Sequence, residues 1–303
     1  EKKEKKEGDN VVAVAAEAGV AARSVAVDDD GRIVLIGLGL GFDGSEKGLR
    51  RLPRIIDLTR VAELRRVEHY PQHIAIGAAV NLQDAFEALA ADRPVIAPFG
   101  ERFAGWPVRQ SGTLGGNVAN GSPIGDSMPL LIALDTRIVL ASTRGERTLP
   151  LEDFYLGYRK TALAPDEVVA RLLVPQPAPG EFLRAYKVSK RYDDDISAVC
   201  LALRVHRSSG VLQGVRIGAG GVAATPARAR QAEAVLEGQA WTEAAAGAAA
   251  QALRAQFQPI SDMRASAAYR REVLGNLMHR FWLESQGHDA INLERVSLED
   301  LQA

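Results

Sequence analysis

Two long apolar runs separated by a short polar turn place the strongest constraint on how this chain folds. Residues 196–207 (ISAVCLALRVHR) and 211–222 (VLQGVRIGAGGV) are rich in β-branched and aliphatic side chains, with SSG between them. Two such runs joined by a short glycine-containing turn are typical of an antiparallel hairpin. From about Pro226 to Glu284 the chain is alanine-rich and its apolar residues have helical spacing, and the last helix is expected to start at Ser261 or Asp262. The C-terminal part is therefore predicted to combine an antiparallel sheet with helices.

The preceding part of the chain mixes helix-like and strand-like patterns. Residues 11–19 (VVAVAAEAG) predict a short helix, and residues 24–37 (SVAVDDDGRIVLIG) predict two strands joined by an Asp/Gly turn. Residues 81–94 predict a helix that begins at an asparagine, and residues 127–142 predict a helix followed by a strand. The Pro-rich residues 176–182 (QPAPGEF) are the best linker candidate in the sequence. A chain of 303 residues with this pattern is expected to form two or three packed units.

Charge and cysteine content exclude several classes of function. The chain has 37 Lys and Arg residues against 38 Asp and Glu residues, which gives no basis for a nucleic-acid-binding surface. Cys200 is the single cysteine, so this sequence cannot hold an intrachain disulfide, a four-cysteine zinc site or an iron–sulfur cluster. Because Cys200 lies in an apolar run, we expect an inert buried thiol. The five histidines are scattered without metal-ligand spacing, so neither a metal site nor a histidine base is expected.

No targeting or membrane segment is expected from the sequence. The start, EKKEKKEGDN, lacks the apolar core of a signal peptide and is expected to be a solvated tail. No apolar run approaches the length of a membrane-spanning helix. These features predict a cytoplasmic location.

Residues 111–127 (SGTLGGNVANGSPIGDS) form a glycine-rich stretch with short polar side chains. Its five glycines allow positive φ angles and close backbone approach, and Thr113, Asn117, Asn120 and Ser122 supply hydrogen-bonding groups. Such segments bind anions through backbone N–H groups, and a helix that begins near Asp126 would add its positive end. The stretch matches neither GxxxxGK[ST] nor GxGxxG after a strand. On composition, the alternative is a surface loop with several turns.

The order of residues in and around this stretch resembles a known family. Residues 108–134 (VRQSGTLGGNVANGSPIGDSMPLLIAL) resemble the second flavin-binding segment of the FAD domain of xanthine dehydrogenase-type molybdenum hydroxylases. Four further segments are similar in order and spacing: RFAGWPVRQ, FYLGYRKTALAPDEVV, YKVSKRYDDDISAV and FQPISDMRASAAYRREVLGNLMHRFWLE. The resemblance covers roughly residues 50 to 285.

The resemblance implies an α+β fold. It implies an FAD-binding domain of the vanillyl-alcohol oxidase (PCMH) type with two αβ subdomains, followed by a three-stranded antiparallel sheet with helices like the C-terminal domain of CO dehydrogenase flavoproteins. The expected divisions are an atypical N-terminal segment (1–33), the FAD-binding domain (34–177), the C-terminal αβ domain (178–290) and a tail (291–303).

The resemblance also implies a set of flavin contacts. The residues that match those around the ribityl and diphosphate portions of FAD are Thr113, Gly115, Gly116, Asn117, Asn120, Ser122 and Asp126. Phe103 matches an aromatic against the flavin ring, Val169 an apolar residue beside it, and Lys187 a lysine near its polar edge. The corresponding alternatives are a helix cap for Asp126, a core side chain for Phe103 and a solvated strand-end charge for Lys187. Residues 190–195 (KRYDDD) match a mobile loop that alters the field at the flavin, or they form a solvated turn.

The first flavin-binding segment departs from the family. Where relatives carry a motif close to AGGTD, this chain has LIGLGLGFDG, in which Gly37, Gly39 and Gly41 keep the backbone permissive. The expected Thr and acidic residue align with Gly39 and Leu40, so two side-chain contacts are missing. Losing two hydrogen bonds of ~0.5 to 1.5 kcal/mol each weakens FAD binding several-fold to a hundredfold. We expect FAD to bind at sub-stoichiometric to full occupancy.

The resemblance implies the FAD-carrying electron-transfer component of a xanthine dehydrogenase-like oxidoreductase. Electrons from hypoxanthine or xanthine oxidation at a molybdenum cofactor would pass through two [2Fe-2S] clusters to FAD and then to NAD⁺ in such an enzyme. No catalytic side chain is expected here, and the clusters and molybdenum cofactor are expected on partner chains or missing portions of a hetero-oligomer. The alternatives are the flavoprotein medium subunit of a carbon monoxide or aromatic-substrate hydroxylase, and a non-enzymatic scaffold that has lost FAD.

Overall fold

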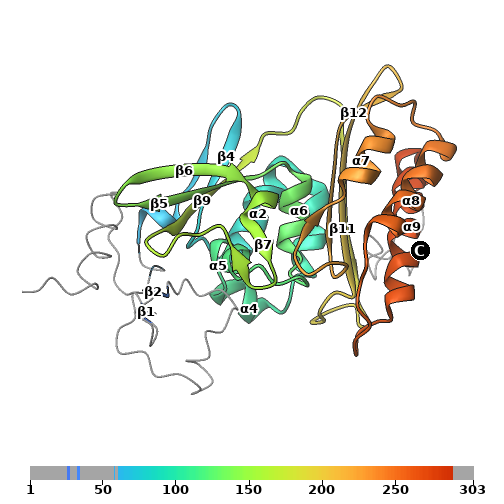
Figure 1. Cartoon of the computed structure of the whole chain (residues 1–303). Helices are drawn as coiled ribbons and strands as arrows, with labels where there is room; N and C mark the ends of the chain where they lie inside the picture. The colour runs from blue at the N-terminus through green and yellow to red at the C-terminus, as the bar shows by residue number, and fades with distance from the viewer. Residues whose placement is uncertain (1–25, 28–32, 35–57, 59–60, 289–303) are drawn as a thin grey trace, which may run out of the picture. The chain divides into compact units, whose positions relative to one another are not determined.

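The structure is a computed structural model that describes residues 26–27, 33–34, 58 and 61–288 (Figure 1). The chain divides into two compact units that are not contiguous in sequence. The first unit comprises Glu1–Ala88, Gly105–Ser122 and Leu134–Gln176, and the second comprises Leu89–Ala104, Pro123–Ala133 and Pro177–Ala303. The domain limits at residues 33, 177 and 290 remain sequence predictions.

A five-stranded antiparallel sheet forms the centre of the first unit. Its order is β3-β4-β9-β5-β6, with the bounds Val67–His69 (β3), His73–Gly77 (β4), Val168–Pro175 (β9), Arg137–Ser142 (β5) and Gly145–Pro150 (β6). Figure 1 shows β4, β9, β5 and β6 as neighbouring arrows. The central strand β9 reads VVARLLVP, and its Val, Ala and Leu side chains are mostly buried. A strand so rich in apolar residues is stable only where both neighbours and both faces are covered.

The chain also forms short helices and strands before and between the strands of this sheet. In chain order they are β1 (Ala26–Val27), β2 (Ile33–Val34), η2 (Glu63–Arg65), α2 (Leu82–Asp92), α4 (Trp106–Ser111), α5 (Leu114–Asn120), η4 (Leu151–Phe154), β7 (Tyr155–Gly157) and β8 (Lys160–Thr161). The antiparallel pairing of β1 and β2 confirms the strand pair predicted within residues 24–37. The helix predicted after Asn81 is confirmed, because Asn81 Oδ1 accepts the N–H of Asp84 at 2.7 Å and caps α2. The helix predicted at residues 11–19 lies outside the described residues.

Glu167 links the start of β9 to the β5–β6 hairpin. Arg147 Nε and Nη2 donate to its two carboxylate oxygens at 2.6 and 2.7 Å, and the N–H of Ala164 donates to Oε2 at 2.8 Å. The bond from Arg147 lowers the pKa of Glu167 below its ordinary value of 4.5 despite the opposing effect of burial, and the Ala164 amide lowers the pKa further. The ionised form is therefore preferred in the folded protein.

This shift predicts a pH dependence of stability. Because the pKa of Glu167 is lower in the folded than in the unfolded chain, its contribution is fully present above about pH 4.5 and is lost as the pH falls through the folded value. Glu167→Gln is expected to lower the melting temperature at neutral pH and to reduce its further fall in acid. Thermal unfolding of both proteins from about pH 7 to about pH 3 measures the difference. An equal acid-induced loss in the two proteins would contradict the prediction.

The second unit is built on the predicted antiparallel hairpin. The sheet order is β10-β11-β12-β13, with the bounds Glu181–Val188 (β10), Val199–Ser208 (β11), Val211–Gly220 (β12) and Ala227–Arg228 (β13). The three long strands are the expected ones, and the two-residue strand β13 extends the sheet. Ser209 and Gly210 connect β11 to β12 with φ angles of 51° and 79°. Two positive φ values define a type I′ turn, whose twist matches that of an antiparallel hairpin.

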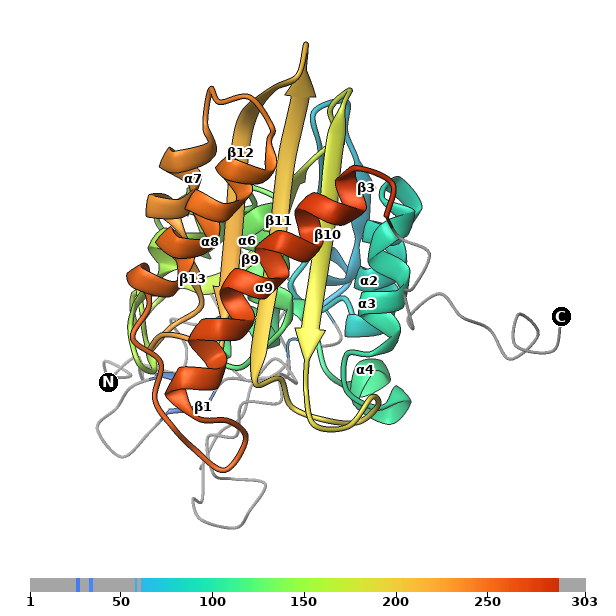
Figure 2. The same cartoon turned by 90° about the vertical axis from the view of Figure 1, so that its right-hand side faces the viewer.

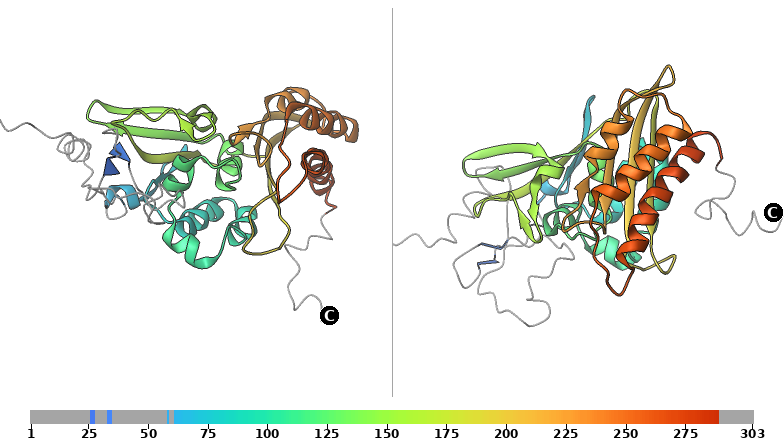
Figure 3. Two further views of the ribbon diagram at one scale, coloured as in Figure 1. Left: turned by 60° about the horizontal axis from the view of Figure 1, so that its bottom comes forward. Right: turned by 45° about the vertical axis from the view of Figure 1, so that its right-hand side comes forward.

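Three helices cover one face of this sheet. They are α7 (Arg230–Leu236), α8 (Glu243–Gln256) and α9 (Ala267–Ser285), and Figures 2 and 3 show all three on one side of the strands. Phe281 on α9 is fully buried, with its ring centroid 5.0 Å from that of Phe182 and 6.0 Å from that of Trp241. Alternate residues of β12, Val215, Ile217 and Ala219, pack in the same core. This confirms the predicted combination of sheet and helices.

The opposite face of the sheet receives shorter helices. Since side chains alternate along a strand, Gly218 and Gly220 of β12 face away from the α7–α9 core. They lie against Pro129 of α6 (Ser127–Ala133). The elements η3 (Pro94–Ile96) and α3 (Ala97–Glu101) contact β10. The helix predicted within residues 127–142 is therefore confirmed as α6, with β5 following it.

Two predicted element limits are wrong. The last helix was expected to begin at Ser261 or Asp262, but α9 begins at Ala267, after the N-cap Ser266. Asp262 Oδ1 instead accepts Arg270 Nη2 at 2.6 Å and two nearby backbone amides, which makes a turn rather than a helix. The linker predicted over residues 176–182 ends at Gly180, because β10 already pairs with β11 from Glu181 onward.

Among the described residues, no helix is long and apolar enough to span a membrane.

Candidate functional site

Much of the glycine-rich stretch of residues 111–127 is helical. Helix α4 ends at Ser111, α5 occupies Leu114–Asn120, and residues 121–126 form the turns that lead to α6, so a loop over the whole stretch is wrong. Thr113 caps α5, because its side-chain oxygen accepts the N–H of Gly116 at 3.1 Å. Local composition did not reveal this helix, because Gly and Asn are poor helix formers and tertiary contacts hold the turn together.

The first amides of α5 are already engaged within the protein. The N–H of Leu114 donates to the carbonyl oxygen of Val80 at 2.9 Å, and the N–H of Gly115 donates to that of Ala78 at 3.1 Å. The Gly116 amide is bound by the helix cap. The first turn of α5 therefore lacks the unpaired N–H groups that a backbone anion site requires.

The glycines of this stretch serve two different structural needs. A Cβ on Gly115 would lie 2.4 Å from the Cβ and 2.6 Å from the carbonyl oxygen of Ala78, so Gly115 permits α5 to approach the 78–82 segment. Of the five glycines, all within the described residues, Gly121 is the one with a positive φ, 57°, and it ends α5. Its Cβ would lie 3.0 Å from the ring of Tyr155.

Tyr155 is a residue of this region that the sequence reasoning did not single out. Its hydroxyl donates to the carbonyl oxygen of Val118 at 3.1 Å, so β7 is bonded to the last turn of α5. Burial raises the pKa of Tyr155 well above its usual value, which keeps the hydroxyl protonated as a donor. Its position in FYLGYRKTALAPDEVV, a segment that resembles the family, was the signal available in the sequence.

The other predicted contacts of the first unit differ in exposure. Asn117 on α5 and Val169 on β9 are buried, whereas Asn120 and Ser122 are half-buried. Thr113, Gly115, Gly116 and Asn117 are brought together on one helical turn. The predicted residues Gly37, Gly39 and Gly41 lie outside the described residues.

In the second unit, the structure joins Asp126 and Lys187 in a buried ion pair. Lys187 Nζ lies 2.6 Å from Asp126 Oδ2, and their side chains are only 2% and 6% exposed. The alternative of a solvated strand-end charge for Lys187 is therefore wrong. The helix-capping alternative for Asp126 is also wrong, because Oδ2 accepts from Lys187 and the buried Oδ1 has no hydrogen-bond partner in the described part of the chain.

Two further groups complete the surroundings of this pair. Ser197 Oγ lies 3.3 Å from Lys187 Nζ, and Cys200 Sγ lies 3.8 Å from the backbone oxygen of Asp126. Burial, aided by the charge of Asp126, raises the pKa of the Cys200 thiol well above its usual value. This confirms the expectation of a buried, unreactive cysteine. Sequence reasoning missed Ser197, although it lies in YKVSKRYDDDISAV, one of the segments that resemble the family.

Phe103 and residues 190–195 also belong to the second unit. Phe103 is buried and precedes Ala104, which has a positive φ of 47°. The 190–195 turn is mostly exposed, with Asp195 Oδ2 accepting the N–H of Arg191 at 2.8 Å and Lys190 Nζ donating to the carbonyl oxygen of Met263 at 2.7 Å. The backbone bond from Arg191 lowers the pKa of Asp195, so its negative charge persists below the usual range. Both proposed roles, flavin contact and field at the flavin, remain predictions.

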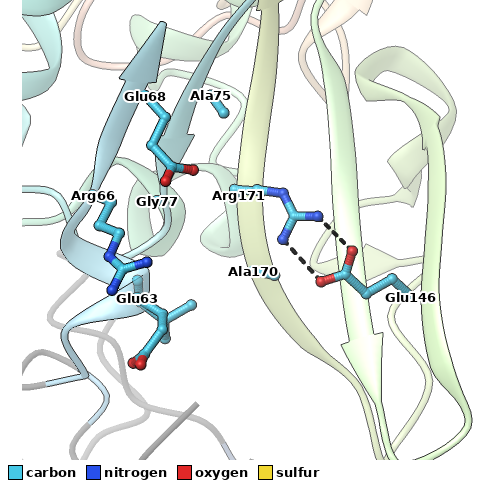
Figure 4. Close-up of a pocket in the computed structure, with 9 residues that line it drawn as sticks. Glu63, Arg66, Glu68, Ala75, Gly77, Glu146, Ala170 and Arg171 are labelled. Atoms are coloured by element: carbon cyan, nitrogen blue, oxygen red, sulfur yellow. Dashed lines mark hydrogen bonds and ion pairs between the residues drawn. The ribbon is translucent and has the colours of Figure 1, made fainter. Parts of the chain in front are cut away.

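A pocket of about 200 Å³ lies elsewhere on the first unit (Figure 4). Its charged lining residues are Glu63, Arg66, Glu68, Glu146 and Arg171. Figure 4 shows the two bonds that pair Arg171 on β9 with Glu146 on β6, 2.8 and 2.5 Å long. The lining includes none of the predicted flavin contacts. In the described ranges, no group of three His, Cys, Asp or Glu residues could hold a metal ion.

Comparison with known proteins identifies the family. Residues 11–177 match the FAD binding domain in molybdopterin dehydrogenase, and residues 184–285 match the CO dehydrogenase flavoprotein C-terminal domain. These matches agree with the α+β architecture, in which an antiparallel sheet with helices forms each part of the chain.

Individual relatives come from more than one kind of enzyme. The chain is 35% identical to a xanthine dehydrogenase of Emericella nidulans over 80% of its own length, but it spans only 18% of that protein. It is 32% identical to the carbon monoxide dehydrogenase medium chain of Hydrogenophaga pseudoflava, covering 75% of this chain and 79% of that one. A solved structure of the carbon monoxide dehydrogenase from Hydrogenophaga pseudoflava superposes with a TM-score of 0.70 at 33% identity, over 74% of this chain and 78% of the other. The chain therefore belongs to the family of FAD binding domains in molybdopterin dehydrogenases, and it also carries the CO dehydrogenase flavoprotein C-terminal domain.

Proposed function

We propose that this chain is the FAD-carrying electron-transfer component of a xanthine dehydrogenase-like molybdenum hydroxylase, with NAD⁺ as electron acceptor. When bound, FAD supplies the chemistry that exchanges electrons between iron–sulfur clusters and a hydride acceptor. The clusters and the molybdenum cofactor belong to partner chains or to further portions of the protein, since Cys200 is the single cysteine here. In this proposal the chain binds and orients the cofactor and supplies no catalytic side chain of its own.

The unpaired oxygen of Asp126 is the observation that carries the proposal. An acceptor buried without a partner is unfavourable by ~1 to 3 kcal/mol, so such a group is expected to be completed by a ligand donor. FAD carries ribityl and ribose hydroxyls, which are donors of the required kind. The residues present therefore fit the cofactor at this position.

We also propose the remaining predicted residues as contacts of FAD. Phe103 and Val169 offer buried apolar side chains for a ring system, and Asn117 offers a buried amide. The other members of the proposed set are Gly37, Gly39, Gly41, Thr113, Gly115, Gly116, Asn120, Ser122 and Lys187.

The direct test is a flavin titration of the purified protein. We expect flavin absorbance after purification, or its recovery when FAD is added, with occupancy between partial and full. Protein that shows no bound flavin and regains none after addition of FAD would refute the proposal and would favour a scaffold that has lost the cofactor. Metal and flavin analysis of the native complex extends the test, since a hydroxylase complex contains FAD, iron and molybdenum together.

A second candidate has a specific observation in its favour. The chain is 32% identical to a carbon monoxide dehydrogenase medium chain along most of the length of both, and a solved carbon monoxide dehydrogenase superposes on it with a TM-score of 0.70. The alternative function is the flavoprotein subunit of a carbon monoxide or aromatic-substrate hydroxylase. Addition of NADH to the flavin-loaded protein distinguishes the two candidates. Bleaching of the flavin absorbance supports NAD⁺ as acceptor, and bound flavin that NADH leaves oxidised supports the alternative.

A further inference from the structure

We propose that Arg270 is a positioning residue for the proposed cofactor contacts Asp126 and Lys187. Arg270 lies near the start of α9, and its guanidinium joins the two backbone segments on which the placement of these contacts depends. The inference rests on the proposed FAD-binding function and adds a residue that is not among the predicted flavin contacts.

The side chain of Arg270 is buried, with 1% of it exposed. Among the described residues, its guanidinium bonds to three acceptors. Nη1 donates to the carbonyl oxygens of Ala198 and Gly221 at 2.5 and 2.7 Å, and Nη2 donates to Asp262 Oδ1 at 2.6 Å. Asp262 supplies the counter-charge that a buried guanidinium requires. The two bonds to carbonyl oxygens have a charged donor, which makes them stronger than bonds between neutral groups.

The bond to Ala198 fixes the residue that follows Ser197. The N–H of Ala198 donates to the carbonyl oxygen of Val188 at 2.8 Å, so this residue is also tied to the end of β10. Ser197 Oγ lies 3.3 Å from Lys187 Nζ. Arg270 therefore holds the connection between β10 and β11 at the point where it meets Lys187.

The bond to Gly221 fixes the segment that precedes α6. Gly221 comes directly after β12, and its N–H donates to the carbonyl oxygen of Pro123 at 2.6 Å. Three residues after Pro123, Asp126 pairs with Lys187. A displacement of Gly221 would therefore be passed through Pro123 to the Asp126 side chain.

Arg270 binds two carbonyl oxygens whose residues lie unusually close together. A Cβ on Gly221, which has a φ of 78°, would lie 2.3 Å from the carbonyl oxygen of Ala198, so glycine is required there. Both residues are buried. Without the guanidinium, each carbonyl oxygen would lose this donor, and a buried acceptor without a partner is unfavourable. The two segments would then move apart to find other donors.

These contacts lie at one end of the second sheet. The register pairs Val188, the last residue of β10, with Val199, the first of β11, and it pairs Cys200 with Gly220, the last of β12. Lys187 precedes Val188 and lies at this same end. Loss of Arg270 is therefore expected to disturb the end of the sheet that carries the proposed contacts.

The opposite end of β10 offers a matched control. Glu181 begins β10, and Arg93 donates through Nε and Nη2 to its two carboxylate oxygens at 2.6 and 3.2 Å. The two side chains are 3% and 7% exposed. At ~3.3 Å per residue, six positions separate Glu181 from Lys187 by about 20 Å. Arg93→Met therefore removes a buried arginine of the same unit at a distance from the proposed contacts.

The experiment compares FAD affinity with stability in the full chain. Quenching of flavin fluorescence gives the affinity of flavin-free wild type, Arg270→Met, Arg270→Lys and Arg93→Met at a temperature where each is folded, and thermal unfolding without FAD gives their stability. Arg270→Met is expected to weaken FAD binding about tenfold. Arg270→Lys keeps the charge, but one ammonium group cannot replace the guanidinium fork, so its affinity is expected to fall between those of wild type and Arg270→Met. Arg93→Met is expected to lower the melting temperature and to change the affinity by less than about threefold.

A purely structural role of Arg270 predicts a different pattern. Affinity of folded Arg270→Met within about threefold of wild type, or equal losses of affinity in Arg270→Met and Arg93→Met, would overturn the inference. If Arg270→Met does not fold, Arg270→Lys decides the question, because it retains the buried charge. A loss of affinity above about threefold in folded Arg270→Lys supports the inference, and a smaller loss contradicts it. Failure of wild type itself to bind FAD refutes the proposed function instead.

Discussion

Gly218→Ala is expected to destabilise the second unit by about 3 kcal/mol or more and to lower FAD affinity at least about tenfold. The added Cβ would lie 2.0 Å from the carbonyl oxygen and 2.8 Å from the carbonyl carbon of Pro129. Both are backbone atoms, so no side-chain rotation relieves the overlap, and α6 must move away from β12. Because Asp126 directly precedes α6, this movement would also separate it from Lys187.

Denaturant unfolding and flavin titration of the same preparations measure these two effects. Gly247→Ala is the matched control, because Gly247 lies within α8 and its Cβ would meet nothing closer than a His279 ring atom at 4.0 Å. An alanine in a helix interior is favoured over glycine by ~1 kcal/mol, so this control is expected to be stabilised. Similar stability of Gly218→Ala and wild type would show that α6 does not depend on close contact with the sheet.

Gly115→Ala is expected to destabilise the first unit by about 2 to 3 kcal/mol. Two effects oppose each other here. Alanine improves helix propensity in α5 by ~1 kcal/mol, but its Cβ would lie 2.4 Å from the Cβ and 2.6 Å from the Cα and carbonyl oxygen of Ala78. The overlap outweighs the gain in helix propensity, because it involves backbone atoms of Ala78. The carbonyl oxygen of Ala78 also accepts the Gly115 N–H at 3.1 Å. The helical turn that carries Thr113 and Asn117 would shift together with residue 115.

Thermal unfolding and FAD affinity of Gly115→Ala are compared with those of Gly157→Ala. Gly157 lies in β7 of the same unit, and no atom lies within 4 Å of its added Cβ, so its replacement tests glycine removal without overlap. We expect near wild-type stability for Gly157→Ala and reduced FAD affinity for Gly115→Ala. A Gly115→Ala protein that is more stable than wild type would show that helix propensity outweighs the contact with Ala78.

Much of the second unit could be predicted because its pattern is local. Alternating apolar residues on both sides of Ser209–Gly210 are sufficient to predict β11 and β12, since a strand's periodicity and a tight turn are properties of adjacent residues. The start of α9 was placed too early for the opposite reason. Asp262 and Ser266 are both acceptable helix caps by type, and the contact between Asp262 and Arg270 decides between them.

Residues 111–127, which resemble a flavin-binding segment, also show where local sequence patterns fail to predict structure. Its order of residues was sufficient to recognise the family, but its composition suggested a loop with free backbone amides. The structure places α5 there and engages those amides with Val80, Ala78 and Thr113. Contacts with residues more than 30 positions away override weak helix propensity, and no window of adjacent residues contains them.

The sequence by itself determined the family, the α+β class and the absence of cysteine ligands for a metal–sulfur centre in this chain. These follow from residue order, periodicity and composition, which need no knowledge of distant contacts. Tertiary structure alone decided the pairing of Asp126 with Lys187, 61 positions apart, and the unpaired Oδ1 that results. Whether a charge is solvated, capping a helix or buried in a pair depends on which segments the fold brings into contact, and for Asp126 that depends on the glycines of β12.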